Sequence, residues 1–236
     1  MPRVITLPLL AAALALFLAG CGEKKKVLDP GEFGVGNGPS NFQGFFASED
    51  EAGRIGVVIS ASSATGALSL ESGGSVALAG TYDSALDSLH LTGVGYEFGG
   101  RVRLVNGVPM VSGRFTSLGN DGWFAVALVS SFGPRVYCGR LLVTGDVVVG
   151  RVGFVFSGVD VVGAACFNGD ADPVPLEGAF DPSAPKPRFL VTGSSVTRTM
   201  ELHGSVDEEA ELAAGSWSAT GTSGDASGTW SAALCP

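Results

Sequence analysis

The chain has 236 residues, of which 23 are acidic and 14 are lysine or arginine, so its formal net charge at pH 7 is −9. An acidic chain repels the phosphate backbone of nucleic acids, and nucleic acid is therefore excluded as an expected partner. Hydrophobic residues make up 45% of the chain and 36 residues are glycine, which is typical of a folded chain with many turns or tight bends.

The first twenty residues have the organisation of a secretory signal. Arg3 precedes a mostly apolar run from Val4 to Leu18, and small residues follow. A helix that crosses a bilayer needs about 20 apolar residues, and this run is shorter and ends in small residues. We therefore expect residues 1–20 to be a signal peptide that is removed after export.

The end of this segment reads Leu18-Ala19-Gly20-Cys21, which resembles the lipobox of bacterial lipoproteins. The resemblance covers the signal region alone. It implies a diacylglyceryl group on Cys21, cleavage before it and acylation of the new amine, so that lipid chains anchor the protein in a membrane. In that family an aspartate after the cysteine favours the inner membrane; Gly22 stands here, which implies an outer-membrane lipoprotein facing the periplasm or the cell surface. The alternative is an ordinary secretory signal followed by an incidental cysteine.

Residues 21–40 are predicted to be the lipidated cysteine and a flexible tether. They are rich in Gly and Pro and show little hydrophobic periodicity. A chain of this composition reaches on the order of 25 Å by random-coil scaling.

The rest of the chain divides into two similar halves, residues 41–130 and 135–236. Gly53-Arg54-Ile55-Gly56 in the first half aligns with Gly150-Arg151-Val152-Gly153 in the second. Glycines recur in the same order along both halves: Gly44, Gly53, Gly56, Gly66, Gly80, Gly93, Gly113 and Gly122 match Gly139, Gly150, Gly153, Gly163, Gly178, Gly193, Gly215 and Gly228. This agreement predicts an internal duplication with two tandem domains.

Each half has the period of β-strands. Apolar residues alternate with smaller or polar ones over short segments, and turn signals separate these segments at Ser72-Gly73-Gly74, Asn106-Gly107 and Asn168-Gly169, the last two being type I′ hairpin signals. We expect an all-β protein of two tandem Gly-rich antiparallel β units, about eight strands each, forming a small barrel or sandwich. Glycine within strands favours barrels, and one larger sandwich built from both halves is the rival arrangement.

Two further expectations concern packing. The segments 56–60 and 153–157 are apolar on both faces, which predicts that the two units contact each other there. Trp123 and Trp230 lie in the last strand of each unit and are expected to plug one end of a small core.

Three cysteines remain beyond Cys21, in a compartment that permits disulfides. Cys138 lies in the first strand of the second unit and Cys235 follows its last strand. First and last strands are neighbours in a closed meander, which favours a Cys138–Cys235 disulfide and leaves Cys166 free; Cys138–Cys166 is the competing pairing.

The sequence contains little that indicates catalysis. His90 and His203 lie between apolar strand residues and are expected to face solvent, and the acidic runs Glu49-Asp50-Glu51, Asp207-Glu208-Glu209 and 168–172 fall at predicted solvated turns. No nucleophile elbow, zinc motif, phosphate loop or complete calcium loop is present, so we expect no catalytic residue, metal or cofactor.

The sequence therefore predicts a membrane-anchored, non-enzymatic envelope lipoprotein that binds an envelope protein or polymer or has a structural role. The alternative is a carrier that holds a small apolar ligand inside a β-barrel. An open barrel interior favours the carrier, and an interior filled by Phe154, Phe156, Trp230 and their neighbours opposes it.

Overall fold

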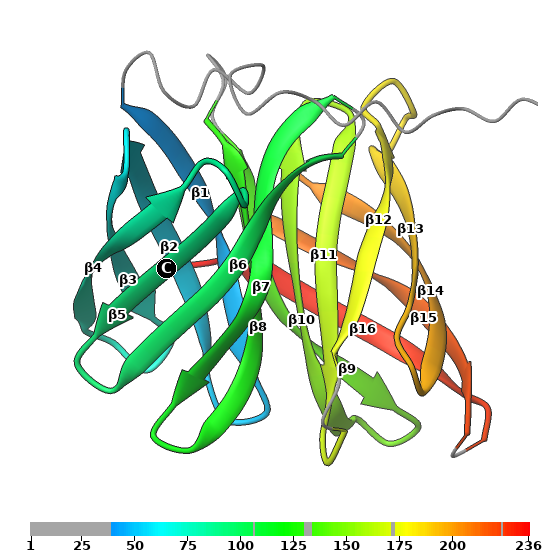
Figure 1. Cartoon of the computed structure of the whole chain (residues 1–236). Helices are drawn as coiled ribbons and strands as arrows, with labels where there is room; N and C mark the ends of the chain where they lie inside the picture. The colour runs from blue at the N-terminus through cyan, green and yellow to red at the C-terminus, as the bar shows by residue number, and fades with distance from the viewer. Residues whose placement is uncertain (1–38, 106, 130–133, 171–172, 223) are drawn as a thin grey trace, which may run out of the picture.

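The protein consists of two β-barrels that stand side by side (Figure 1). A computed structural model describes residues 39–105, 107–129, 134–170, 173–222 and 224–236, so the predicted signal peptide, Cys21 and nearly all of the tether lie outside the described residues. All regular structure in the described part is β-strand. The described residues include no helix with the length and apolar character needed to span a bilayer.

Within the described ranges, sixteen antiparallel strands form two closed barrels of eight strands each, which confirms the expected fold class and excludes one larger sandwich. The first barrel contains β1 (Ser40–Ser48), β2 (Ala52–Ser60), β3 (Ser63–Leu70), β4 (Ser75–Asp83), β5 (Ser88–Gly93), β6 (Tyr96–Val105), β7 (Val108–Ser117) and β8 (Asn120–Leu128). The second contains β9 (Arg135–Val143), β10 (Val147–Ser157), β11 (Asp160–Phe167), β12 (Val174–Asp181), β13 (Arg188–Ser194), β14 (Arg198–Asp207), β15 (Leu212–Gly221) and β16 (Ala226–Leu234).

Both barrels close in the same way, by pairing the first strand with the last. The backbone amide of Val129 donates to the carbonyl of Asn41 over 2.8 Å in the first barrel. At the matching place in the second barrel, the amide of Cys235 donates to the carbonyl of Val136 over 2.9 Å. The two halves are thus structural repeats of each other down to the hydrogen bond that closes the seam.

Matched glycines let neighbouring strands approach closely. A β-carbon on Gly80 would lie 1.9 Å from the carbonyl oxygen of His90, and one on Gly178 would lie 1.9 Å from that of Leu190. A real side chain does not fit at such distances, because they are far below van der Waals contact. The same requirement in β4 and in β12 explains why the glycine pattern survives in both halves.

Side chains fill both barrel interiors. In the first barrel, the ring of Phe98 lies 5.1 Å from that of Phe115 and 5.2 Å from that of Phe124. In the second, Phe154 contacts Trp230 with ring centroids 5.2 Å apart, and Phe156 contacts Phe189 at 5.0 Å. All these residues are buried. The centre of each barrel is therefore an aromatic core, as expected when only eight strands close.

A third apolar cluster, the inter-barrel core, joins the two barrels. Its buried members are Phe45, Ala47, Ala52, Val105, Met110, Ala125 and Ala127 from the first barrel and Val136, Val155, Val162, Ala164, Cys166 and Cys235 from the second. The prediction of contact through 153–157 holds for β10, which supplies Val155. For 56–60 it was wrong, because Val57 and Ile59 point into the first barrel's own interior and the first barrel docks mainly through β1 and β8.

The prediction for Trp123 was also wrong. Phe124, not Trp123, faces the interior of the first barrel and occupies the position that Trp230 holds in the second. Trp123 is half-buried on the outside, against the inter-barrel core. Side chains alternate between the two faces of a strand. Trp123 stands one position before Phe124, the residue that matches Trp230, so its side chain points out of the barrel.

Turn predictions had mixed outcomes. The segment 72–74 does connect β3 and β4, with Gly73 and Gly74 at φ of 91° and 100°. Asn168-Gly169 does not form a two-residue hairpin, since six residues separate β11 from β12. Gly107 adopts a φ of 91° between β6 and β7, while Asn106 lies outside the described residues.

Candidate functional site

The structure assigns the three cysteines beyond the tether to two different roles. Cys138 and Cys235 form a disulfide across the seam of the second barrel, which is the pairing that the strand order favoured. Cys166 is free and buried in the inter-barrel core. Burial raises the pKa of its thiol to about 12, so it remains protonated and unreactive at neutral pH. Cys21, the predicted lipidation site, lies outside the described residues.

The two histidines face solvent, as expected, and do not come together. His90 on β5 contacts Glu97 at 3.0 Å, and His203 on β14 contacts Glu201 at 2.5 Å. Each histidine borders an open hollow on the outer face of its own barrel. These hollows have floors of small residues, including Gly99, Gly100 and Gly113 in one and Gly204 and Gly215 in the other, and each is formed by a single barrel.

A more structured depression lies between the barrels, at the end reached by the turn between β1 and β2. We call it the distal cleft, because it lies at the opposite end of the first barrel from Ser40, where β1 begins (Figure 1). Its volume is about 550 Å³. It is lined by Ser48, Asp50, Glu51, Ala52, Glu71, Ser72, Ser117, Leu118 and Asn120 from the first barrel and by Arg140 and Arg151 from the second.

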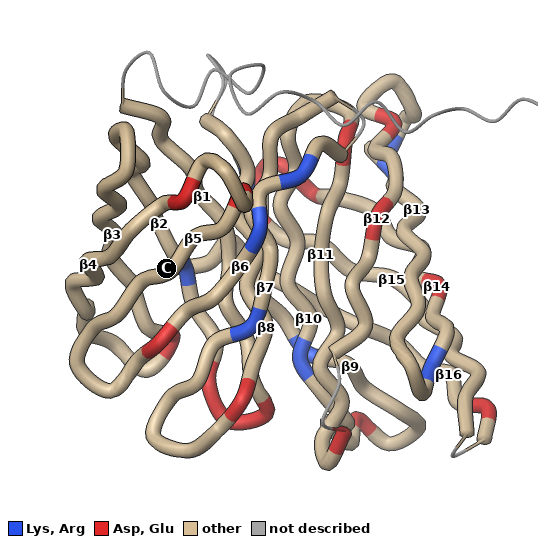
Figure 2. The backbone as a smooth tube through the Cα atoms, viewed as in Figure 1, with Lys and Arg blue, Asp and Glu red and all other residues tan. Residues whose placement is uncertain are grey.

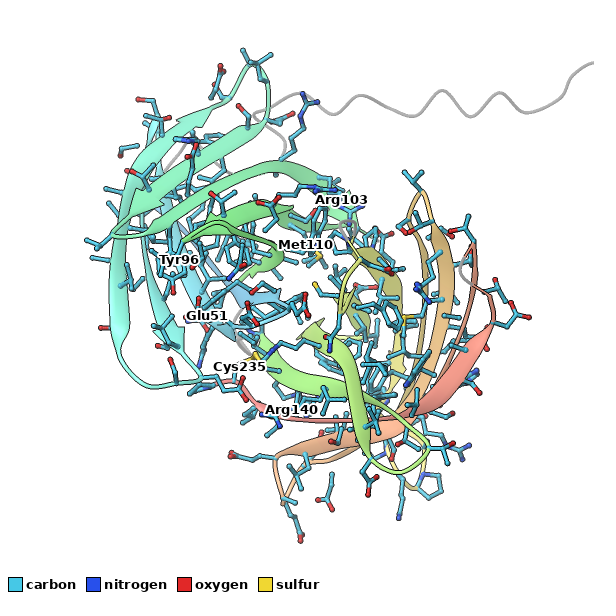
Figure 3. The ribbon with its side chains drawn as sticks, turned by 90° about the horizontal axis from the view of Figure 1, so that it is seen from below. Glu51, Tyr96, Arg103, Met110, Arg140 and Cys235 are labelled. Atoms are coloured by element: carbon cyan, nitrogen blue, oxygen red, sulfur yellow. A yellow bond between two sulfur atoms is a disulfide. The ribbon has the colours of Figure 1, made fainter. Side chains whose placement is uncertain are left out.

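Acidic and basic positions both occur along the backbone at this end of the molecule (Figure 2). Seen from below, Glu51 belongs to the first barrel and Arg140 to the second (Figure 3). A cleft built from two barrels exists only while they stay docked, which makes its geometry dependent on the inter-barrel core.

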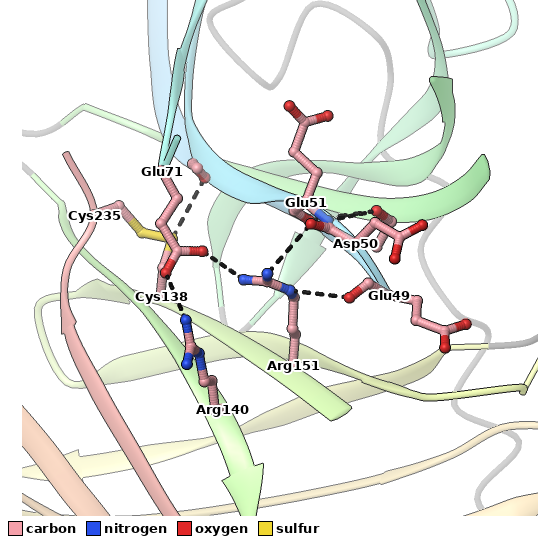
Figure 4. Close-up of polar contacts among 10 residues, drawn as sticks. Glu49, Asp50, Glu51, Glu71, Cys138, Arg140, Arg151 and Cys235 are labelled. Carbon is pink, nitrogen blue, oxygen red and sulfur yellow. Dashed lines mark hydrogen bonds and ion pairs between the residues drawn. A yellow bond between two sulfur atoms is a disulfide. The ribbon is translucent and has the colours of Figure 1, made fainter. Parts of the chain in front are cut away.

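Arg151 on β10 fixes the floor of the cleft. Its Nε donates to the carbonyl of Glu49 over 3.1 Å, its Nη2 donates to the carbonyl of Asp50 over 3.3 Å, and its Nη1 pairs with the carboxylate of Glu71 (Figure 4). Only 16% of its side chain is exposed. A guanidinium has a rigid fork of donors, so Arg151 holds both the β1–β2 turn and the β3–β4 turn of the first barrel against the second barrel.

Arg140 on β9 is the cross-strand partner of Arg151. Two like charges directly opposite each other in a sheet destabilise it unless a counter-charge is present. Glu71 supplies that charge: one of its oxygens binds Arg151 and the other lies 3.6 Å from Arg140 (Figure 4). The side chain of Arg140 is 55% exposed, so its fork of donors is open to the cleft.

Glu51 is held on the opposite wall. The hydroxyl of Tyr96 donates to its Oε2 over 2.7 Å, and the Ser117 hydroxyl donates to the same oxygen over 3.4 Å. Burial, together with the hydrogen bond to Glu51, raises the pKa of Tyr96, so the phenol stays a donor. Both hydrogen bonds are made to the same carboxylate oxygen, and they orient the Glu51 side chain. Both donors are neutral hydroxyl groups, so these contacts do not neutralise the carboxylate.

The acidic run 49–51 lies in a turn in which Glu49 and Asp50 are exposed, as predicted, but the turn also makes specific contacts that the sequence did not indicate. Its backbone carbonyls bind Arg151, Glu51 binds Tyr96, and Asp50 accepts a hydrogen bond of 3.0 Å from Asn120. Sequence reasoning did not identify Arg151 as a site residue, although it stands in the repeated Gly-Arg-x-Gly motif. The matched Arg54 pairs with Gln43 within the first barrel, so the motif alone does not reveal the inter-barrel role.

The barrels are also linked near the other end, where Arg103 on β6 pairs with Glu177 on β12 at 2.6 Å. Within the described ranges, no group of three or more His, Cys, Asp and Glu side chains is arranged to hold a metal ion. Comparison of the chain with models of protein families, with curated proteins and with solved structures gave no match.

Proposed function

We propose that the protein is an envelope lipoprotein, anchored through Cys21 in the outer membrane, that acts as a non-enzymatic binding or structural scaffold. The lipid end holds the chain at the membrane, residues 21–40 act as a tether, and the docked barrels present the distal cleft away from the anchor. The expected partner is an envelope protein or polymer, and nucleic acid is not expected because the chain is acidic.

The observation that carries this proposal is the distribution of the four cysteines. Cys138 and Cys235 are joined in a disulfide, a bond that persists in extracytoplasmic compartments and is rare in the cytosol. Cys166 is buried and inert. Cys21 thus remains as the cysteine available for modification, and it stands at the end of a secretory signal within Leu18-Ala19-Gly20-Cys21.

The filled interiors favour a scaffold over a ligand carrier. Phe154, Phe156 and Trp230 are buried and in ring contact with Phe189, so they occupy the space that an apolar ligand inside the second barrel would need. A ligand then has to bind outside the barrels, and the distal cleft combines residues of both in one depression.

The proposal is tested by substitution of Cys21 by serine in cells that produce the full chain. The unchanged protein is expected to incorporate an alkyne-labelled fatty acid and to enter the detergent phase of a Triton X-114 partition. Cys21→Ser is expected to lose both properties, because serine cannot carry the thioether. Cys166→Ser is the matched control and should keep both. Fatty-acid incorporation that survives in Cys21→Ser would contradict the anchor.

The scaffold role has its own test. Photocrosslinking residues placed at exposed positions around the distal cleft of the intact lipoprotein should give one discrete crosslinked species, and the same residue at the outer face of β5 should not. An even pattern of crosslinks over both positions would contradict a specific binding role for the cleft.

A further inference from the structure

The distal cleft has two arginines on the second barrel that share the carboxylate of Glu71, while the carboxylates of Asp50 and Glu51 on the first barrel have neutral partners; this arrangement points to a ligand class. On the second barrel, Arg151 already has three acceptors, whereas Arg140 makes one contact of 3.6 Å with Glu71 among the described residues. Two arginines therefore share a single carboxylate. This wall has an excess of positive charge and an open guanidinium fork, which suits a carboxylate that binds in bidentate fashion.

The opposite wall has the complementary character. Glu51 has one oxygen held by Tyr96 and Ser117, and Asp50 accepts from the side-chain amide of Asn120. These partners are neutral donors, so they position the two carboxylates without cancelling their charge. An ammonium group has three donors and no acceptor, and it matches two positioned carboxylates.

An apolar rim completes the cleft. Leu118 lines it and is 91% exposed, and Val94 on the neighbouring hairpin is 89% exposed. The two hairpins are joined by a hydrogen bond of 3.3 Å from the Leu118 amide to the Gly95 carbonyl. A ligand that reaches across the cleft would thus meet a cationic group, an anionic pair and an aliphatic edge.

We propose that the distal cleft binds a short peptide segment with a free carboxylate and a free amino group, the carboxylate on Arg140 and the amino group on Glu51 and Asp50. Aliphatic side chains of the peptide pack against Leu118. A neutral saccharide lacks both charges and would leave the separated walls unmatched. This inference rests on the proposed binding role and assigns a ligand class to it.

The test uses the full-length lipoprotein in detergent micelles and isothermal titration calorimetry. Alanine peptides of increasing length with free ends are compared with the same peptides after N-acetylation or C-amidation, and chitotetraose serves as the saccharide. The free-ended peptides are expected to bind, and blocking either end should weaken binding about tenfold, as the loss of a charge-assisted contact would. Binding of chitotetraose without binding of any peptide would overturn the assignment.

Two variants then locate the two ends. Arg140→Gln should bind the acid and the C-amide equally, because the cation that distinguishes them is gone. Glu51→Gln should bind the amine and its N-acetyl form equally, while glutamine still accepts the hydrogen bonds of Tyr96 and Ser117. Arg101→Gln removes an exposed arginine from the outer face of β6 and is the matched control.

Each comparison is a ratio of two affinities within one variant, so a reduced fraction of folded protein does not alter it. The proposal would be overturned if Arg101→Gln also bound the free acid and the C-amide equally, or if Arg140→Gln still bound the free acid more tightly than the C-amide. Failure of all peptides to bind would also overturn it, and would leave the lipidation of Cys21 and the crosslinking test of the scaffold role unaffected.

Discussion

Gly153 provides a direct test of how the barrels dock. A β-carbon at this position would lie 2.2 Å from Cδ2 and 2.5 Å from Cγ of Phe45, whose side chain is completely buried in the inter-barrel core. The ring has no solvent to move into, so Gly153→Ala must displace it or separate the barrels. Overpacking of this kind costs about 1–3 kcal/mol.

The duplication provides the matched control. Gly56 is the repeat equivalent of Gly153, and a β-carbon there would meet no atom within 4 Å. Alanine in place of glycine reduces the freedom of the unfolded chain and stabilises by about 0.4–1 kcal/mol where it fits. This gain is common to both variants, so the difference between them isolates the overpacking, about 1–3 kcal/mol.

The assay is urea denaturation of the full chain, followed by tryptophan fluorescence. Gly153→Ala is expected to unfold at lower urea concentration than Gly56→Ala, and the addition of Phe45→Leu should recover part of the loss because a smaller side chain leaves room for the methyl group. Equal midpoints for Gly153→Ala and Gly56→Ala would refute the docking through Phe45 and Gly153.

Three other predictions follow from the cysteines and tyrosines. Cys138 and Cys235 are 97 residues apart, so replacing both by serine should lower the free energy of unfolding by up to about 4.7 kcal/mol, measured as a shift of the urea midpoint; an unchanged midpoint would contradict a stabilising disulfide. Cys166 should react with Ellman's reagent at neutral pH only after denaturation, because its thiol is buried and has a pKa of about 12; reaction of the native protein would exclude that environment. All three tyrosines have raised pKa values, that of Tyr82 reaching about 12 from 10.0 through burial and a hydrogen bond to Asp87. The contribution of Tyr82 to stability is fully present below pH 10 and is lost as the pH rises to about 12, so its tyrosinate absorbance should appear together with unfolding in that window; titration of all three tyrosines at pH 10 in a protein that stays folded would contradict it.

Much of the architecture could be predicted because it depends on local patterns. Alternating strand residues and glycines at matched positions are sufficient to indicate two β units. Glycine at position 80 and again at 178 reflects a close approach of neighbouring strands at the same place in both barrels. The Cys138–Cys235 disulfide was predictable for a similar reason, since closure of a meander places its first and last strands together.

The docking of the barrels and the distal cleft could not be predicted from local patterns. Arg151 and Glu71 are 80 positions apart, and they meet because β10 of one barrel lies against the turn between β3 and β4 of the other. An alternating strand pattern does not indicate which outer face of one barrel will pack against the other barrel. The same limitation explains the errors for 56–60 and Trp123, where the strand was identified and the direction of its side chains was not.

Intact mass spectrometry of the protein purified from membranes of the cells that produce it measures the proposed anchor itself. A lipid-anchored protein is expected to begin at Cys21, to lack residues 1–20 and to carry the added mass of two or three acyl chains at that residue. A chain that retains residues 1–20, or one that begins at Cys21 without any acyl group, would contradict a lipid-anchored scaffold.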